Sequence, residues 1–380
     1  MKKIGIIGAG ISGLYIANLF KKNPKYQISI FDKKNSLNFD EGYGLQLSVN
    51  SVKLLNEIGF NKLKKDEKFN PEKINFYSKK VQDKICELNI TKFNSSDCKY
   101  TTLKRSSLIN FLKKDLEDFI KTNYSVSKID QDQEKIKLTF ENKETHECDY
   151  LIISDGVFSK SRNLVSNKQI QPKYNDTLAI RGMIPANSNI IDKKNILLFL
   201  GSDFHHVIYP VSSSEDLNLI AIMKYKLSAE EQKNYSLFSD KSFIQKILEN
   251  IPQENKEFFN NLKELKIFPV FVSDNFFEVK NKNIHLIGDA FFAFPPSFAQ
   301  GASQSIEGAH ELFASIENNS NANFFKNRVN KTKMVNNRSK LNQFAFHLSN
   351  PLTVYFRNIF LKKLVKNKKF LESYLGKIYR

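Results

Sequence analysis

The 380-residue sequence predicts an α/β fold with a parallel sheet and an inserted sheet-rich region, and three observations support this prediction. Residues 3–32 follow the pattern strand, glycine turn, helix and strand. Two later apolar strands, at 149–153 and 284–287, run directly into turns that carry glycine and aspartate. Residues 177–225 are short apolar or alternating segments separated by turn residues. The strand-to-turn units indicate a parallel sheet, and the all-β stretch indicates a second region.

The glycine turn after the first strand has the spacing G-x-G-x-x-G. Gly8 permits the tight turn, Gly10 lets the backbone come close to a pyrophosphate, and Gly13 allows the helix to pack against the strand. The N-terminus of the following helix favours an anion because its N–H groups are free and its dipole is positive there. The next strand, 28–31, ends in Asp32, whose carboxylate is suited to an adenosine ribose. The stretch predicts dinucleotide binding without separating NAD from FAD.

Two other interpretations of this stretch are weaker. A signal peptide needs an unbroken apolar segment and an A-x-A cleavage site, but spaced glycines interrupt the segment and no such site follows. An ordinary glycine turn needs neither a strand on each side nor a terminal aspartate, and this turn has both.

Length and composition restrict the class of protein. The length suits two to three domain-sized units, no run reaches the roughly 18 apolar residues of a membrane span, and the mean hydropathy is −0.41. We therefore expect a cytoplasmic protein. Lys and Arg total 58 against 40 Asp and Glu, a net charge of +18, but the lysines are spread along the chain. Nucleic-acid binding is not expected, whereas the basic field favours anionic small molecules such as a nicotinamide dinucleotide or an aromatic acid.

The cysteines and histidines do not indicate a metal site. Cys86, Cys98 and Cys148 are scattered and form no C-x-x-C pair, which suits a reducing cytoplasm. His205 and His206 are adjacent, so in a strand they point to opposite faces and cannot bind one ion together. No metal is expected.

The rest of the chain gives local predictions. Residues 42–60 predict irregular backbone followed by a helix, and 101–116 predict an amphipathic helix that opens with capping residues and carries Arg105 near its start. Residues 81–88 are strand-like. Helical patterns return at 228–266, and a strand-like run follows at 268–273.

Three stretches together resemble one family. GAGISG from Gly8, SDGVFSKSR from Ser154 and IGDAFFAFPPSFAQGASQSIEGAHEL from Ile287 resemble, in order and spacing, the pyrophosphate, DG and GD motifs of the class A FAD-dependent aromatic hydroxylases, the para-hydroxybenzoate hydroxylase and ubiquinone-biosynthesis hydroxylase group. The likeness covers nearly the whole chain. It implies a Rossmann-like FAD-binding domain with an inserted sheet-rich substrate domain and C-terminal helices.

The same resemblance implies the domain boundaries. The FAD-binding domain takes 1–70, 101–165 and 275–335, the β-sheet substrate domain takes 71–100 and 166–274, and C-terminal helices at 336–380 pack on the FAD domain. Residues 351–380 also combine apolar residues with many lysines, which allows a weak peripheral membrane contact.

The resemblance also implies contacts to the cofactor. Those to the pyrophosphate are Gly8, Gly10, Ile11, Ser12 and Gly13. Asp32 and Lys33 are implied at the adenosine ribose, and Gln46 at the flavin edge. Arg105 is implied at the diphosphate, and Asp289 at the ribityl chain. Asp155 and Gly156 are implied in FAD and nicotinamide dinucleotide contacts, and Gly301 and Ala302 in contacts with the flavin pyrimidine ring.

The implied reaction is reduction of FAD by NADH or NADPH, formation of a flavin C4a-hydroperoxide with O2, and hydroxylation of an aromatic or quinone-like small molecule. The resemblance implies that Pro295 and Pro296 shape the loop on the flavin side where oxygen reacts. Arg181 and Tyr209 are candidate substrate contacts, with a structural arginine and a core tyrosine as the alternatives. A monomer and a dimer are both compatible with the sequence.

The chain departs from the family at three positions. Phe292 replaces a usual histidine, Ser303 a common asparagine and Ser154 an alanine, which leaves flavin tuning and substrate choice open. Alternatives that share the motifs are a FAD-dependent reductase or epoxidase of isoprenoid-type substrates and a flavin-binding redox module without turnover. Flavin halogenases are disfavoured because their W-x-W-x-I-P signature needs tryptophan, and the chain has none.

Overall fold

The structure is a computed structural model. It describes residues 1–37, 43–78, 83–132, 135–166, 168–185, 192–213, 217–260 and 262–379. Gly42, at the start of the predicted 42–60 segment, and Val81 and Gln82, at the start of the predicted 81–88 strand, lie outside these ranges.

A five-stranded parallel sheet forms the first layer, in the order β18-β12-β1-β2-β8. Its strands are β1 (Lys2–Ile7), β2 (Tyr26–Phe31), β8 (Ile120–Lys121), β12 (Tyr150–Ile153) and β18 (Ile284–Leu286). The register aligns Ile7 with Ile153 and Ile153 with Leu286. Because the strands are parallel and end in register, the turns that follow β1, β12 and β18 come together at one edge.

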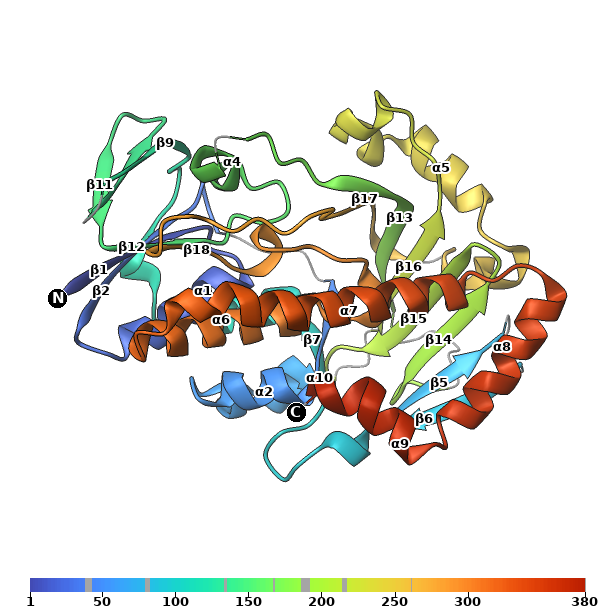
Figure 1. Cartoon of the computed structure of the whole chain (residues 1–380). Coiled ribbons are helices and arrows are strands. Elements are labelled where there is room, and N and C mark those ends of the chain that lie inside the picture. Colours follow the sequence, from blue (N-terminus) through green and yellow to red (C-terminus); the bar gives the residue numbers. More distant parts are fainter. Residues whose placement is uncertain are drawn as a thin grey trace.

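Helices cover one face of this sheet and a small sheet covers the other (Figure 1). The helical face has α1 (Ile11–Lys21), α2 (Val49–Asn56), α3 (Arg105–Lys113) and α6 (Gly301–Glu317). Ile4 and Ile6 of β1 belong to this core, whereas Ile7 faces β9 (Val126–Gln131), β10 (Ile136–Phe140) and β11 (Thr145–Cys148). The alternation places a buried apolar side chain on each face of β1.

A seven-stranded sheet forms the inserted region, in the order β17-β13-β16-β15-β14-β5-β6. Its strands are β5 (Lys73–Tyr77), β6 (Lys84–Asn89), β13 (Lys173–Ile184), β14 (Ile196–Gly201), β15 (Phe204–Pro210), β16 (Leu217–Lys224) and β17 (Lys263–Val272). One face packs on α5 (Lys241–Glu249) through residues such as Phe199 and Ile247. The other face carries Leu198, Val207 and Tyr209 and points toward the C-terminal helices.

The C-terminal helices connect the two regions. They are α7 (Phe324–Phe346), α8 (Pro351–Leu364), α9 (Lys368–Leu371) and α10 (Lys377–Tyr379). α7 contacts α6 and the turn at Pro296–Phe298, α8 contacts β6 of the seven-stranded sheet, and α10 contacts α2 (Figure 1). In the part of the chain that the structure describes, no helix is both long and apolar enough to cross a membrane.

Two local predictions were wrong at their boundaries. Residues Thr101–Lys104 form strand β7, not the first turn of the predicted 101–116 helix, because they pair with β3 (Gly44–Leu47) and β4 (Lys68–Phe69) and bury both threonines. β17 begins at Lys263, inside the predicted helical stretch 228–266, because it pairs with β13 along most of its length. In both segments sheet pairing outweighs the local signal.

Candidate active site

A cavity of about 970 Å³ lies where the turns of the parallel sheet meet the seven-stranded sheet and the C-terminal helices. Its lining includes the sequence-predicted residues Gly10, Ile11, Ser12, Gln46, Arg105, Gly156, Arg181, Tyr209, Asp289, Pro296, Gly301 and Ala302. Gly8, Gly13, Asp32, Lys33, Asp155 and Pro295 do not line it. The fold therefore gathers residues from turns almost 300 positions apart into one site.

The three motif turns are in direct contact, which explains several of the glycines. Gly8 has φ +99°, and an added Cβ there would lie 2.6 Å from the carbonyl oxygen of Ser154. A Cβ on Gly13 would lie 2.0 Å from the carbonyl oxygen of Gly8, and one on Gly288 would lie 2.5 Å from Ser12 Oγ. Ser154 Oγ donates a hydrogen bond to the Ile7 or Gly8 carbonyl oxygen, at 2.8 and 2.9 Å. Contacts this short leave no space for a larger side chain.

Two other glycines border open space. A Cβ added at Gly10 or Gly301 would meet no atom of the described residues within 4 Å. Gly10 caps the N-terminus of α1 and Gly301 is the first residue of α6, so both helices direct their free N–H groups toward the cavity. Glycine at these positions is not required by the protein's own packing. It leaves backbone accessible to an anionic or electron-rich group, which is what a dinucleotide diphosphate and a flavin ring require.

Asp32 lies at the end of β2 beside the glycine turn. Its carboxylate accepts hydrogen bonds from the Ala9 N–H at 2.8 Å and from the Lys34 N–H at 2.9 Å. Lys33 is exposed. The bond to Ala9 fixes the carboxylate at the edge of the turn, which supports the predicted ribose contact, but the structure brings Lys33 to no part of the cavity wall.

Asp289 and Arg105 both line the cavity and interact electrostatically. The Asp289 side chain is reached from the cavity but is otherwise enclosed by protein, and this burial raises its pKa to about 6, while the positive charge of Arg105 opposes the rise. Arg105 is the first residue of α3, and its N–H donates to the Tyr43 carbonyl oxygen at 2.7 Å. The pair places one negative and one positive group beside the turns that are suited to a dinucleotide.

The DG turn is held by an arginine that the sequence analysis missed. Arg162 is buried and donates to the carbonyl oxygens of Ala290 at 3.1 Å and Val157 at 3.1 Å, so it joins the DG turn to the GD turn. Asp155 accepts a hydrogen bond from the Ser159 hydroxyl and another from the Ser161 N–H at 3.2 Å, at the start of α4 (Lys160–Ser166). Asp155 therefore has a structural role as a helix cap, and Gly156 is the member of the turn that lines the cavity.

A polar cluster lies on the other wall. Tyr100 donates a hydrogen bond to Gln46 Oε1 at 2.7 Å. Tyr209 is buried beside Gln46, and burial raises the pKa of its hydroxyl, with Arg181 and Gln46 opposing the rise. The Arg181 guanidinium lies 5.9 Å from the centre of the Tyr43 ring, which is a favourable cation–π distance. The structure thus brings Gln46, Arg181 and Tyr209 together, although they come from β3, β13 and β15.

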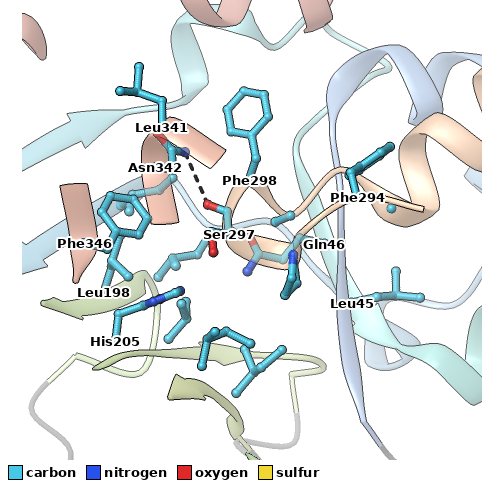
Figure 2. Close-up of a pocket in the computed structure, with 18 of the residues that line it drawn as sticks. Leu45, Gln46, Leu198, His205, Phe294, Ser297, Phe298, Leu341, Asn342 and Phe346 are labelled. Atoms are coloured by element: carbon cyan, nitrogen blue, oxygen red, sulfur yellow. Dashed lines mark hydrogen bonds between the residues drawn. The ribbon is translucent and has the colours of Figure 1, made fainter. Parts of the chain in front are cut away.

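The remaining wall is mainly apolar and includes His205 (Figure 2). His205 from β15 points toward Leu198 and Phe346, and its Nδ1 is 2.7 Å from His347 Nε2. Burial lowers the pKa of both rings, that of His347 to about 4, so both are neutral at pH 7 and one donates to the other. His206 points to the opposite face, as predicted from strand alternation, and stacks on Phe199 with 4.5 Å between ring centres.

Comparison with known proteins identifies the family. The family described as FAD binding domain matches residues 1–321. The chain belongs to the FAD-binding domain family. Salicylate hydroxylase of Pseudomonas putida is 24% identical over 343 residues, covering 82% of this chain and 75% of that enzyme. 6-Hydroxynicotinate 3-monooxygenase of Bordetella bronchiseptica is 21% identical and covers 97% of this chain and 98% of that enzyme.

Solved structures give the same fold. Klebsiella pneumoniae HpxO, solved with FAD and uric acid, matches with a TM-score of 0.83 at 14% identity over 99% of this chain and 96% of that one. A salicylate hydroxylase in complex with its substrate matches with a TM-score of 0.75 at 17% identity, covering 100% of this chain and 97% of that one. The predicted α/β fold, the resemblance to FAD-dependent aromatic hydroxylases and the FAD cofactor are confirmed, and this FAD-binding protein is a monooxygenase.

The departures from the family pattern have structural explanations in this FAD-binding protein. Phe292 does not line the cavity and stacks on Phe276, with 4.3 Å between ring centres, inside a core cluster. Ser303 is fully buried, and its Oγ accepts from the Ser48 N–H at 3.0 Å. Both positions therefore stabilise the loop and helix around the flavin end. In the described part of the chain, no group of three His, Cys, Asp or Glu side chains is placed to hold a metal ion.

Proposed function

We propose that this monooxygenase hydroxylates a flat aromatic or quinone-like molecule of mainly apolar surface, with O2 and NADH or NADPH as cosubstrates. One observation carries the proposal: the cavity lining is mainly apolar, and Gln46, Arg181 and Tyr209 form a polar cluster within it. The related enzymes from Pseudomonas and Bordetella are named for salicylate and 6-hydroxynicotinate, which are aromatic compounds with a few polar groups.

The residues around the motif turns fit FAD. The N-termini of α1 and α6 would hold the diphosphate and the pyrimidine edge of the flavin, through Gly10 and Ser12 in one case and Gly301 and Ala302 in the other. Asp289 would accept hydrogen bonds from the ribityl chain. When bound, the cofactor supplies the redox chemistry that links a reduced nicotinamide nucleotide to O2.

The protein's own side chains position the substrate and keep the site dry. Arg181 and the Tyr209 hydroxyl would bind a polar substituent of the ring, because they belong to one polar cluster in a lining that is otherwise mainly apolar. Leu198 and Phe346 would pack on the faces of the ring (Figure 2). Pro296 and the N–H groups of α6 would frame the flavin side. Exclusion of water by the apolar wall protects the activated oxygen from unproductive decay.

The test is a product screen with purified, flavin-loaded protein. We expect one or more aromatic compounds to accelerate NAD(P)H oxidation and to yield a product heavier by one oxygen atom that carries label from ¹⁸O2. Tyr209→Phe removes only the hydroxyl and is expected to raise KM for that compound more than it lowers kcat. Tyr235→Phe, at an exposed aromatic away from the cavity, is the matched control. Failure to take up FAD, or oxidation that gives only hydrogen peroxide with every aromatic tested, would refute the proposal.

A cytoplasmic location is part of the proposal. Cys86, Cys98 and Cys148 are all free thiols, and burial raises the pKa of Cys148 to about 12, so it is unreactive as a thiolate at neutral pH. Free thiols of this kind suit a reducing compartment. Fractionation of cells that produce the full chain would contradict this if the protein were found outside the cytoplasm.

A further inference from the structure

The outer surface of the C-terminal helices carries an unusual group of exposed apolar side chains, which we call the α7–α8 lip. It consists of Phe344 on α7 and Leu352, Tyr355, Phe356 and Phe360 on α8, with exposed fractions of 67%, 63%, 62%, 49% and 59%. Leu352, Phe356 and Phe360 are spaced by four residues, so they lie along one face of the helix. Contiguous exposed aromatic side chains of this kind mark an interaction surface.

The opposite face of α8 is packed against the protein. Arg357 is buried and its guanidinium donates to the Ala345 carbonyl oxygen at 3.4 Å and to Asn358 Oδ1 at 3.0 and 3.1 Å. Leu361 packs against the core cluster under the seven-stranded sheet. The orientation of α8 is therefore fixed by contacts on its inner face, and the exposure of the lip is not a consequence of a loose helix.

The lip is also the mouth of the cavity. Phe344, Phe356 and Phe360 line the cavity and are at the same time exposed. Behind them Leu361 and Leu364 continue the lining toward Tyr374 and Leu198. An apolar molecule that enters here meets mainly carbon surface, with Asn342, Thr353 and Arg357 as polar members of the same lining.

The charges around the lip have one sign. Residues 351–371 contain no Asp or Glu, and their basic residues are Arg357, Lys362, Lys363, Lys366, Lys368 and Lys369. The five lysines are all exposed. Lys363 follows Phe360 by three positions, so it continues the apolar face of α8 at its C-terminal end. An apolar stripe bordered by lysines is the pattern of a helix that lies at the surface of an anionic membrane.

We propose that the α7–α8 lip docks on an anionic lipid membrane and that the substrate enters the cavity from the membrane surface. Charge complementarity selects this occupant. A second copy of the chain would bring two clusters of lysines together on proteins that each carry a net charge of +18, which opposes pairing through this face. α8 has 14 residues, shorter than the roughly 20 that span a bilayer, so the helix lies on the membrane. The docking step stands by itself, whereas the entry of the substrate rests on the proposed function.

Cosedimentation of the full, flavin-loaded chain with lipid vesicles tests the proposal. Vesicles of phosphatidylcholine alone are compared with vesicles that also contain phosphatidylserine, at low and high salt. We expect binding to the anionic vesicles that weakens at high salt, and little binding to the neutral ones. Phe356→Ser with Phe360→Ser, and separately Lys362→Glu with Lys363→Glu, should each lower the affinity by roughly tenfold or more. Tyr235→Ser removes an exposed aromatic elsewhere, at 60% exposure, and should change nothing.

Each other result overturns the docking proposal. The docking proposal is refuted if the protein does not bind anionic vesicles at low salt. The proposed role of charge is refuted if the protein binds both kinds of vesicle equally. Concentration-dependent dimerisation that the Phe356→Ser and Phe360→Ser pair abolishes, without vesicle binding, assigns the lip to a second copy. Flavin absorbance and the unfolding temperature confirm that each variant is folded. Vesicle binding without hydroxylation refutes the proposed function alone, and hydroxylation without vesicle binding refutes the docking alone.

Discussion

Replacement of Gly10 by alanine separates the folding of the protein from its binding of FAD. Gly10 has φ −85° and ψ −171°, a backbone conformation that alanine adopts without strain, and a Cβ there meets no protein atom within 4 Å. We therefore expect the free energy of unfolding of the flavin-free Gly10→Ala variant to equal that of the wild type or to exceed it by up to about 1 kcal/mol, because alanine lowers the conformational entropy of the unfolded chain.

The same methyl group would stand where the diphosphate approaches the N-terminus of α1. It would displace at least one hydrogen bond between a backbone N–H and a charged oxygen. Such a bond contributes about 1.5–3 kcal/mol, so the affinity for FAD should fall by roughly ten- to a hundredfold. Titration of flavin-free protein with FAD, followed by flavin fluorescence, measures this change, and urea unfolding of the same samples measures stability.

Two matched glycines sharpen the comparison. Gly301→Ala also meets open space, at the predicted flavin end, and should weaken FAD binding without loss of stability. Gly13→Ala should lower stability itself, since its Cβ would lie 2.0 Å from the Gly8 carbonyl oxygen. The reasoning is refuted if Gly10→Ala binds FAD like the wild type while its stability is unchanged, because the diphosphate would then lie elsewhere.

Three further variants test the electrostatics of the site. His206 is buried, neither of its ring nitrogens has a partner among the described residues, and burial lowers its pKa to about 3. The unfolded chain therefore takes up a proton at this histidine first as the pH falls below about 6.5. His206→Phe should raise the unfolding free energy by about 1 kcal/mol at pH 7 and flatten the loss of stability toward pH 4, measured by urea unfolding. Asp289 has a raised pKa of about 6, so the folded chain holds the extra proton between about pH 4 and 6 and loses stability as the pH rises through this window. Asp289→Asn should remove that slope in the flavin-free protein yet retain FAD less well, and an unchanged slope would contradict the burial of this carboxyl. Arg162→Lys should lower stability because one ammonium cannot replace the planar guanidinium that bonds the DG and GD turns, and a wild-type unfolding midpoint would contradict that role.

The FAD half of the molecule was predictable because its signals are local. Gly8, Gly10 and Gly13 mark a turn within six residues, and the turns at Asp155-Gly156 and Gly288-Asp289 each follow an apolar strand directly. Parallel pairing then brings the three strand ends together without further information. Arg162 lay inside one of the quoted motifs, and a charged residue at the start of a short helix after an apolar strand was the signal that could have found it.

The substrate half was predictable only in outline, because its contacts join distant positions. His205 and His347 are 142 residues apart, and neither has a local pattern that points to the other. Tyr100 and Tyr379 approach each other across most of the chain, with 6.0 Å between ring centres. The strand at Thr101–Lys104 was hidden for the same reason, since its partners β3 and β4 lie more than thirty residues away. Periodicity reports on one element at a time and carries no information on such pairings.

This difference between the two halves has a consequence for how the enzyme is built. The turns at Gly8, Gly13 and Gly288 pack so closely that a Cβ added there would lie only 2.0–2.6 Å from backbone or Ser12, so almost any change at these glycines affects folding. The substrate wall is shared among β14 and β15, which pair in the sheet, and α7 and the last residues of the chain, whose apolar side chains pack on these strands. Side-chain packing tolerates exchange of one apolar residue for another of similar volume at small cost. Substitutions on α7, on α8 or near Tyr374 can therefore reshape the cavity while the flavin site stays intact, and the same C-terminal segment that forms the mouth is the part of this enzyme in which substrate choice is most easily changed.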